Sequence, residues 1–174
     1  MTDKLEESLA YDFFRNTSFS RESIRSIPRP DYHSVEPFKT YPDSKKVLLP
    51  RTGWELAEAR VIPLLQKRRS TRQFSTSPIS LTDLAVMLWG AQGITAQAGS
   101  HLFRTAPSAG ALYPVETYIV VQNVNDLQKG IYHLDVRSFQ LELINEGDYS
   151  QQISAAFLDQ EFMIQAAVNV VWTA

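Results

Sequence analysis

The sequence contains no cysteine, which excludes disulfide bonds, thiolate metal sites and a thiol nucleophile. It also lacks any run of about 18 apolar residues, the length that a membrane-spanning helix needs. The net charge is only −2 (17 − 19), so no overall attraction to nucleic acid or to a membrane surface is expected. The three histidines are too scattered to predict a metal site. With 44% hydrophobic residues in 174, the chain is expected to form one globular domain or a little more, in a reducing cytoplasm.

Residues 1–52 differ in composition from the rest of the chain. They hold five of the nine prolines and seven aromatic residues. Proline disfavours both helices and strand ladders, whereas a disordered tail has few aromatic residues. We therefore expect an extended arm over residues 1–52, wrapping a folded body or a partner subunit, and a folded domain over residues 53–174. The first ten residues are rich in acidic side chains and have no apolar core, so no secretory signal is expected.

Two helices are expected before residue 95. Residues 55–67 have helix-forming composition, with apolar residues spaced at three and four. Ser80 and Asp83 form a capping-box-like start for the second helix. Its apolar residues form one stripe along the helix, Leu81, Leu84, Ala85, Leu88 and Trp89. We expect Gly90 and Gly93 to end this helix.

The second half of the chain alternates between strand and helix patterns. Residues 115–122, 130–135 and 139–144 have β-branched, aromatic or alternating character and predict strands, the last two as a hairpin. Residues 148–158 predict a helix, and residues 167–174 predict a buried strand. These elements predict an α+β fold. Because a buried strand needs neighbours on both edges, we expect the sheet to be completed by something outside this sequence, as in a truncated chain. A native C-terminal strand in the middle of a sheet is the alternative.

The first chemical motif lies at residues 67–72, Lys-Arg-Arg-Ser-Thr-Arg, which place four cations and two hydroxyls in six residues. A phosphate needs charged donors of fixed direction, and arginine supplies a planar fork to which a serine or threonine hydroxyl adds a short donor. Three other interpretations remain open. The cations complement the dipole of the preceding helix, form a solvated face, or make a site for a basophilic kinase.

The second motif is residues 104–114, Arg-Thr-Ala-Pro-Ser-Ala-Gly-Ala-Leu-Tyr-Pro. Its small residues allow a flat ligand to approach the backbone closely. The hydroxyl of Ser108 is a candidate partner for the edge of a heteroaromatic ring, and Tyr113 is a candidate for stacking. The alternative is a loop that leads into a strand, with Pro107 and Pro114 marking the turns of that loop.

In this order, the two motifs resemble the SagB-type dehydrogenases, a branch of the FMN-dependent nitroreductase superfamily. The likeness extends to Leu-Trp-Gly-Ala-Gln-Gly-Ile-Thr between the motifs and to Gly-Ile-Tyr-His-Leu-Asp at residues 130–135. It implies a mixed, largely antiparallel sheet flanked by helices, and an intertwined homodimer with two FMN sites at the subunit interface. It also implies that this chain holds the N-terminal part of the FMN-binding domain.

The resemblance carries over site residues position by position. It assigns Arg68, Arg69, Ser70 and Arg72 to the FMN phosphate and ribityl chain, and Pro107, Ser108, Ala109, Gly110 and Tyr113 to the isoalloxazine ring. The flavin itself carries the hydride chemistry, with NAD(P)H or a substrate as the electron donor. No catalytic residue is assigned, because the Lys-Tyr pair of the azoline-oxidising branch is expected beyond Ala174.

Two functions from other classes are weighed against a flavin oxidoreductase that acts on a small molecule or a peptide. One is a non-catalytic partner module, in which the fold is kept and the site is incomplete. The other is nucleic-acid binding through residues 67–72. An acidic balance over the rest of the chain, without a nucleic-acid fold pattern, argues against the second.

Overall fold

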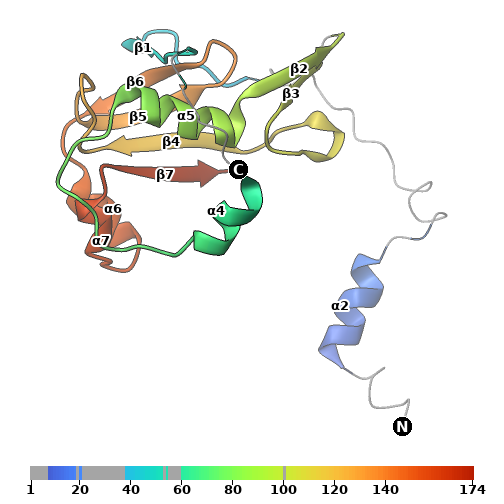
Figure 1. Ribbon diagram of the computed structural model, residues 1–174. Helices are drawn as coiled ribbons and strands as arrows, with labels where there is room; N and C mark the ends of the chain where they lie inside the picture. Colours follow the sequence, from blue (N-terminus) through green and yellow to red (C-terminus); the bar gives the residue numbers. More distant parts are fainter. Residues whose placement is uncertain (1–7, 19, 21–37, 53, 55–59, 100) are drawn as a thin grey trace. The chain divides into compact units, whose positions relative to one another are not determined.

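The computed structural model describes residues 8–18, 20, 38–52, 54, 60–99 and 101–174 (Figure 1). The chain divides into two compact units, residues 1–35 and residues 36–174. The described part of the first unit contains the helix α2 (Leu9–Thr17). The Ser8 hydroxyl begins this helix by accepting a hydrogen bond from the backbone N–H of Tyr11 at 3.2 Å. All the other described elements belong to the second unit.

Five strands of the second unit form one sheet in the order β1-β6-β5-β4-β7 (Figure 1). They are β1 (Lys46–Leu48), β4 (Glu116–Val121), β5 (Gly130–Asp135), β6 (Gln140–Glu146) and β7 (Val168–Thr173). Every neighbouring pair in this sheet is antiparallel. The predicted α+β class with a largely antiparallel sheet is therefore confirmed. A separate hairpin, β2 (Ile94–Ala98) with β3 (His101–Arg104), was not predicted.

The helix α5 (Leu81–Gln92) lies across one face of the sheet and supplies much of the core (Figure 1). Its Leu84 and Leu88 are 0–1% exposed and belong to one cluster with Ile119, Tyr132 and Leu141 from the sheet. The other helical segments of the second unit are α4 (Val61–Lys67), η1 (Ala109–Ala111), α6 (Ser150–Ala156) and α7 (Phe162–Gln165). Strand alternation places the buried apolar side chains on the face that α5 covers.

One expectation about a helix end is corrected, and another is tested only in part. The helix α5 continues through Gly90 and ends at Gly93, because the packing of its buried stripe outweighs a glycine penalty of about 1 kcal/mol. The helix expected over residues 55–67 is observed as α4 from Val61, and residues 55–59 lie outside the described residues. The stretch 1–52, expected to be an extended arm, contributes the helix α2 and the sheet strand β1.

The helix α5 begins with a side-chain cap at Ser80. The Ser80 hydroxyl accepts a hydrogen bond from the Asp83 backbone N–H at 3.0 Å and caps the helix, as the sequence predicts. Replacing Ser80 with alanine leaves that N–H without its partner and is expected to lower the free energy of unfolding by about 1 kcal/mol. Urea denaturation measures the change. Ser77→Ala, at an exposed serine outside the helix, is the control and is expected to stay within about 0.5 kcal/mol of wild type.

The face of the sheet opposite α5 carries a row of polar side chains. Lys46, Glu142, His133 and Tyr118 lie opposite one another across β1, β6, β5 and β4. His133 lies at the centre, with Nδ1 3.0 Å from Glu142 Oε2 and Nε2 2.9 Å from Glu116 Oε2. The side chains of His133 and Glu142 are both 0% exposed. Since each ring nitrogen faces a carboxylate oxygen, this imidazole holds two acidic side chains in place.

Residues 39–41 cover this polar row. The Tyr41 backbone N–H donates to Glu142 Oε2 at 2.9 Å, and the Tyr41 and Tyr118 hydroxyls lie 2.9 Å apart. Lys39 Nζ donates to the Tyr118 hydroxyl at 2.7 Å. This hydrogen bond raises the pKa of Lys39, while burial raises the pKa of Tyr118. These contacts fasten the stretch before β1 to the sheet.

Candidate functional site

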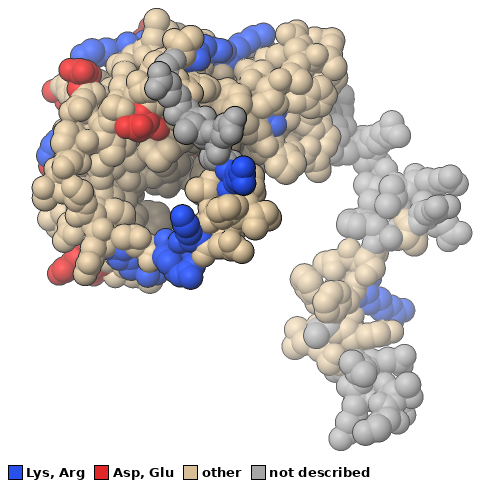
Figure 2. Space-filling view, viewed as in Figure 1, with Lys and Arg blue, Asp and Glu red and all other residues tan. Residues whose placement is uncertain are grey.

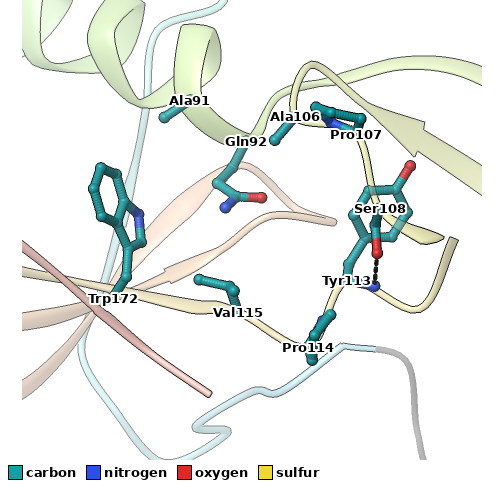
Figure 3. Close-up of a pocket in the computed structure, with 9 residues that line it drawn as sticks. All are labelled: Ala91, Gln92, Ala106, Pro107, Ser108, Tyr113, Pro114, Val115 and Trp172. Atoms are coloured by element: carbon teal, nitrogen blue, oxygen red, sulfur yellow. Dashed lines mark hydrogen bonds between the residues drawn. The ribbon is translucent and has the colours of Figure 1, made fainter. Parts of the chain in front are cut away.

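A cavity of about 490 Å³ lies where the C-terminal end of α5 meets β7 and the segment leading into β4 (Figure 3). Its lining residues are Ala91, Gln92, Ala106, Pro107, Ser108, Tyr113, Pro114, Val115 and Trp172. Apart from Gln92, Ser108 and Tyr113, these residues are apolar. The volume lies within the roughly 300–1,000 Å³ of typical small-molecule sites, which combine apolar walls with few polar groups.

A tight turn forms one wall of this cavity. The Ser108 hydroxyl accepts a hydrogen bond from the Tyr113 backbone N–H at 2.9 Å, drawn as a dashed line in Figure 3. Between them the chain forms η1, and Gly110, Ala111 and Tyr113 have φ values of 64°, 53° and 44°. This left-handed region costs a non-glycine residue roughly 1 kcal/mol. Strained backbone of this kind is concentrated at functional sites, so the turn is a candidate ligand-binding segment.

Arg104 lies behind this wall and is only 9% exposed. Its Nη1 donates to Gln92 Oε1 at 3.2 Å, and its backbone N–H donates to the Tyr113 hydroxyl at 3.0 Å. The guanidinium lies over the ring of Tyr113, 4.6 Å from the centroid, and 5.3 Å from that of Phe38. Burial lowers the pKa of Arg104, and the nearby Glu116 and Tyr113 act in the opposite direction. A cation held this rigidly can fix the orientation of its neighbours.

The structure brings only one of the two predicted groups of site residues to the cavity. Pro107, Ser108 and Tyr113 line it, and Ala109 and Gly110 lie in η1 between them. The residues predicted to hold the phosphate, Arg68, Arg69, Ser70 and Arg72, are not among the lining residues. The roles of both groups stay predictions.

The basic segment follows α4 directly and is exposed throughout. Figure 2 shows Lys and Arg side chains gathered around α4. Arg69 Nη1 donates to the backbone oxygens of Gln66 and Arg68, and the Arg72 guanidinium lies 5.7 Å from the ring centroid of Phe162. Within the described ranges no carboxylate forms an ion pair with the cations of residues 67–72. Among the described residues, their charge is therefore not neutralised by a carboxylate.

The places of three residues in the cavity region were not predicted from the sequence. Trp172 lies in the stretch 167–174 that was predicted as a buried strand, yet it is 60% exposed at the cavity edge, because no described element covers that end of β7 on the α5 side. Gln92 was not singled out, although a polar residue at the end of an apolar helix is a usable signal. The burial of Arg104 has no signature in the sequence.

Comparison with known proteins identifies the family. The sequence profile described as "Nitroreductase family" matches residues 65–174, which include the basic segment and the whole cavity lining. The chain belongs to the nitroreductase family. Nitroreductases of this family generally use flavin cofactors, and their fold agrees with the sheet and helices described above.

Individual nitroreductases and one processing protein resemble the chain in part. A provisionally named nitroreductase of Methanocaldococcus jannaschii is 31% identical over 129 residues, covering 74% of this chain and 62% of the relative. The trifolitoxin-processing protein TfxB of Rhizobium leguminosarum bv. trifolii is 40% identical over 47 residues, 26% of this chain and 13% of that protein. A crystal structure of a provisionally named nitroreductase from Anabaena variabilis aligns with a TM-score of 0.69 at 26% identity.

This nitroreductase chain spans only part of those relatives. The alignment with the Anabaena structure includes 96% of this chain but only 32% of the Anabaena chain. The alignment with the Methanocaldococcus protein includes 62% of that protein. In the part of the chain that the structure describes, no helix is both long and apolar enough to cross a membrane. No group of three or more His, Asp or Glu residues suited to a metal ion is found in that same part.

Proposed function

We propose that the protein is an FMN-dependent oxidoreductase that transfers hydride between a donor and a substrate through bound FMN. The observation that carries this proposal is the cavity closed by the Ser108–Tyr113 turn, which combines small residues with polar groups. It supports the assignment of residues 107–110 as the segment beside a planar ring. Family membership supports a flavin, and the choice of FMN rests on the motif resemblance.

The residues present fit such a cofactor. A fused aromatic ring needs a slot with apolar walls, and Val115, Pro107 and Trp172 offer these walls. Its polar edge needs hydrogen-bond partners inside the slot, and Gln92 and Ser108 offer them. The FMN phosphate needs cations, and residues 68–72 supply exposed ones that pair with no carboxylate of the described chain.

Each group of residues then has a physical task. Arg68, Arg69, Ser70 and Arg72 would neutralise and orient the phosphate, and residues 107–110 with Tyr113 would hold the ring. Bound FMN would supply the hydride acceptor and donor. The walls of the cavity would exclude water from one side of the ring and leave the other for NAD(P)H or the substrate.

A homodimer with FMN at the subunit interface accounts for the separation of the two groups. The basic segment does not line the cavity of its own chain, so a complete site is best explained by residues from two subunits. The apolar side chains of α4 agree with such an interface, since Val61, Ile62, Leu64 and Leu65 are 56–65% exposed. Exposed apolar patches of this kind mark interaction surfaces.

We further propose that the protein belongs to the SagB-type branch and works in the cytoplasm. The order of its motifs supports this placement, and so does the 47-residue match to the trifolitoxin-processing protein. The substrate class proposed is a small molecule or a peptide. A non-catalytic partner module of the same fold is the competing proposal, and the presence or absence of bound flavin separates the two.

The visible absorption spectrum of the purified protein tests the proposal most directly. FMN released by heat in near-stoichiometric amount is the expected result. A protein that stays colourless after incubation with FMN would contradict the oxidoreductase proposal and favour the partner module.

The proposed role of Arg68 and Arg72 in holding the FMN phosphate can be tested by mutation. Replacing Arg68 and Arg72 together with alanine removes two cations and is expected to abolish FMN retention while the fold is kept, because both side chains are exposed. Flavin per protein after gel filtration measures the loss, and circular dichroism checks the fold. Lys45→Ala with Lys129→Ala removes the same charge elsewhere on the surface and is expected to keep the flavin. Unchanged occupancy in the Arg68 and Arg72 variant would refute the assignment.

A further inference from the structure

The side-chain amide of Gln92 is held in one orientation. A guanidinium has only donors, so the amide atom that faces Arg104 Nη1 at 3.2 Å must be the oxygen Oε1. Arg104 is itself fixed by its buried position against the rings of Tyr113 and Phe38. A flipped amide would set two donors against each other in a buried place, which is costly.

This orientation directs the amide nitrogen into the cavity. In Figure 3 the oxygen of Gln92 lies on the side of Tyr113, and the nitrogen points towards the space between Val115 and Trp172. Gln92 is only 7% exposed, and no described residue accepts a hydrogen bond from its Nε2. The helix α5 therefore ends with a buried polar group that is aimed into the cavity and lacks a partner in the described chain.

The second polar group of the wall has the same character. The Ser108 oxygen already accepts a hydrogen bond from the Tyr113 N–H, so its hydroxyl proton remains to be donated. Both groups thus offer hydrogens to the cavity. The buried positive charge of Arg104 behind them adds a potential of the same sign.

We infer that Gln92, positioned by Arg104, is the specificity-determining hydrogen-bond donor of this cavity and selects a ring edge that bears acceptor atoms. The inference rests on the proposed function and deepens it, because the carbonyl and aza edge of a flavin ring has this chemistry. Donors and a nearby cation also stabilise electron density on such an edge. They therefore favour the reduced form of a bound flavin.

Gln92→Glu tests this role, because glutamate keeps the shape and the acceptor towards Arg104 but loses the donor. FMN titration followed by flavin fluorescence is expected to show a dissociation constant raised about tenfold to a hundredfold. The midpoint potential of the bound flavin is expected to fall, and the thermal midpoint of the protein is expected to be kept. Gln151→Glu makes the same charge change at an exposed position of α6 and is expected to match wild type.

Each outcome of the titration has one meaning. If wild type binds no FMN, the proposed function fails and the inference fails with it. If wild type binds FMN, and both the dissociation constant and the potential of Gln92→Glu equal those of Gln151→Glu, the inference is wrong while the proposed function stands. Should circular dichroism show that Gln92→Glu is unfolded, Gln92→Met decides by the same readouts, with weakened binding expected and wild-type binding overturning the inference.

Discussion

Replacing His133 with phenylalanine is expected to lower the free energy of unfolding by about 3–5 kcal/mol, because it leaves a buried carboxylate without its close partner. Phenylalanine keeps a flat ring in place but has no nitrogen to offer. Among the described residues, the Glu142 carboxylate, 0% exposed, would then keep the Tyr41 backbone N–H at 2.9 Å and Lys46 at 3.7 Å as its partners. Glu116 would lose its partner as well. Guanidinium chloride denaturation followed by circular dichroism measures the change.

Two controls separate burial from charge in this experiment. Lys129→Ala breaks an ion pair of 2.7 Å with Asp148, but these side chains are 53% and 47% exposed, so a loss of at most about 1 kcal/mol is expected. Adding Glu142→Leu to His133→Phe removes the stranded carboxylate and is expected to restore much of the lost stability. A His133→Phe protein as stable as Lys129→Ala would show that the buried Glu142 carboxylate does not depend on the imidazole.

Gly93→Ala is expected to destabilise the protein by about 1–3 kcal/mol or more and to weaken ligand binding in the cavity. A Cβ at Gly93 would lie 2.4 Å from Trp89 Cδ1 and 2.5 Å from the Trp89 backbone oxygen. The backbone cannot easily retreat, because the Gly93 N–H donates to Trp89 at 2.7 Å and its carbonyl accepts from Thr105 at 2.8 Å. Since Gln92 is the preceding residue, any shift of this turn moves the cavity amide.

Gly90→Ala is the matched control three residues earlier in the same helix. No heavy atom lies within 4 Å of a Cβ built there, and the position is exposed. Alanine in a helix interior is favoured over glycine by about 0.5–1 kcal/mol, so this variant is expected to be more stable than wild type. Thermal unfolding of the two variants should therefore shift in opposite directions. A shift of the same sign and size in both would refute the steric argument at Gly93.

Much of the fold follows from local patterns in the sequence. Residues 130–135 were predicted as a strand with the bounds that the structure gives, because alternation marks an antiparallel strand with one apolar face. The start of α5 follows from the Ser80 cap. The hairpin of β2 and β3 was missed because its residues are mostly exposed and show no run of alternating large apolar side chains. Gly99, with φ of 60°, is a described residue of its turn.

The candidate site could be predicted only in part. The Pro107–Tyr113 wall was found because small residues between two prolines are visible in the sequence. Gln92 and Arg104 act through burial and through each other, across twelve residues of sequence, and no local pattern encodes that contact. The exposure of Trp172 likewise depends on what covers the end of β7, a property of tertiary structure.

The strand β1 pairs with β6, which lies far along the chain and is synthesised much later. Tyr41, just before β1, bonds to Glu142 across 101 residues of sequence. At about 5–20 residues per second, the ribosome needs roughly 5–20 s to make the partner after the strand. The β5–β6 hairpin, joined by a short turn, closes within microseconds once made. The segment around β1 is therefore made well before its partner, and it can take its place at the edge of the sheet only after β6 has been made.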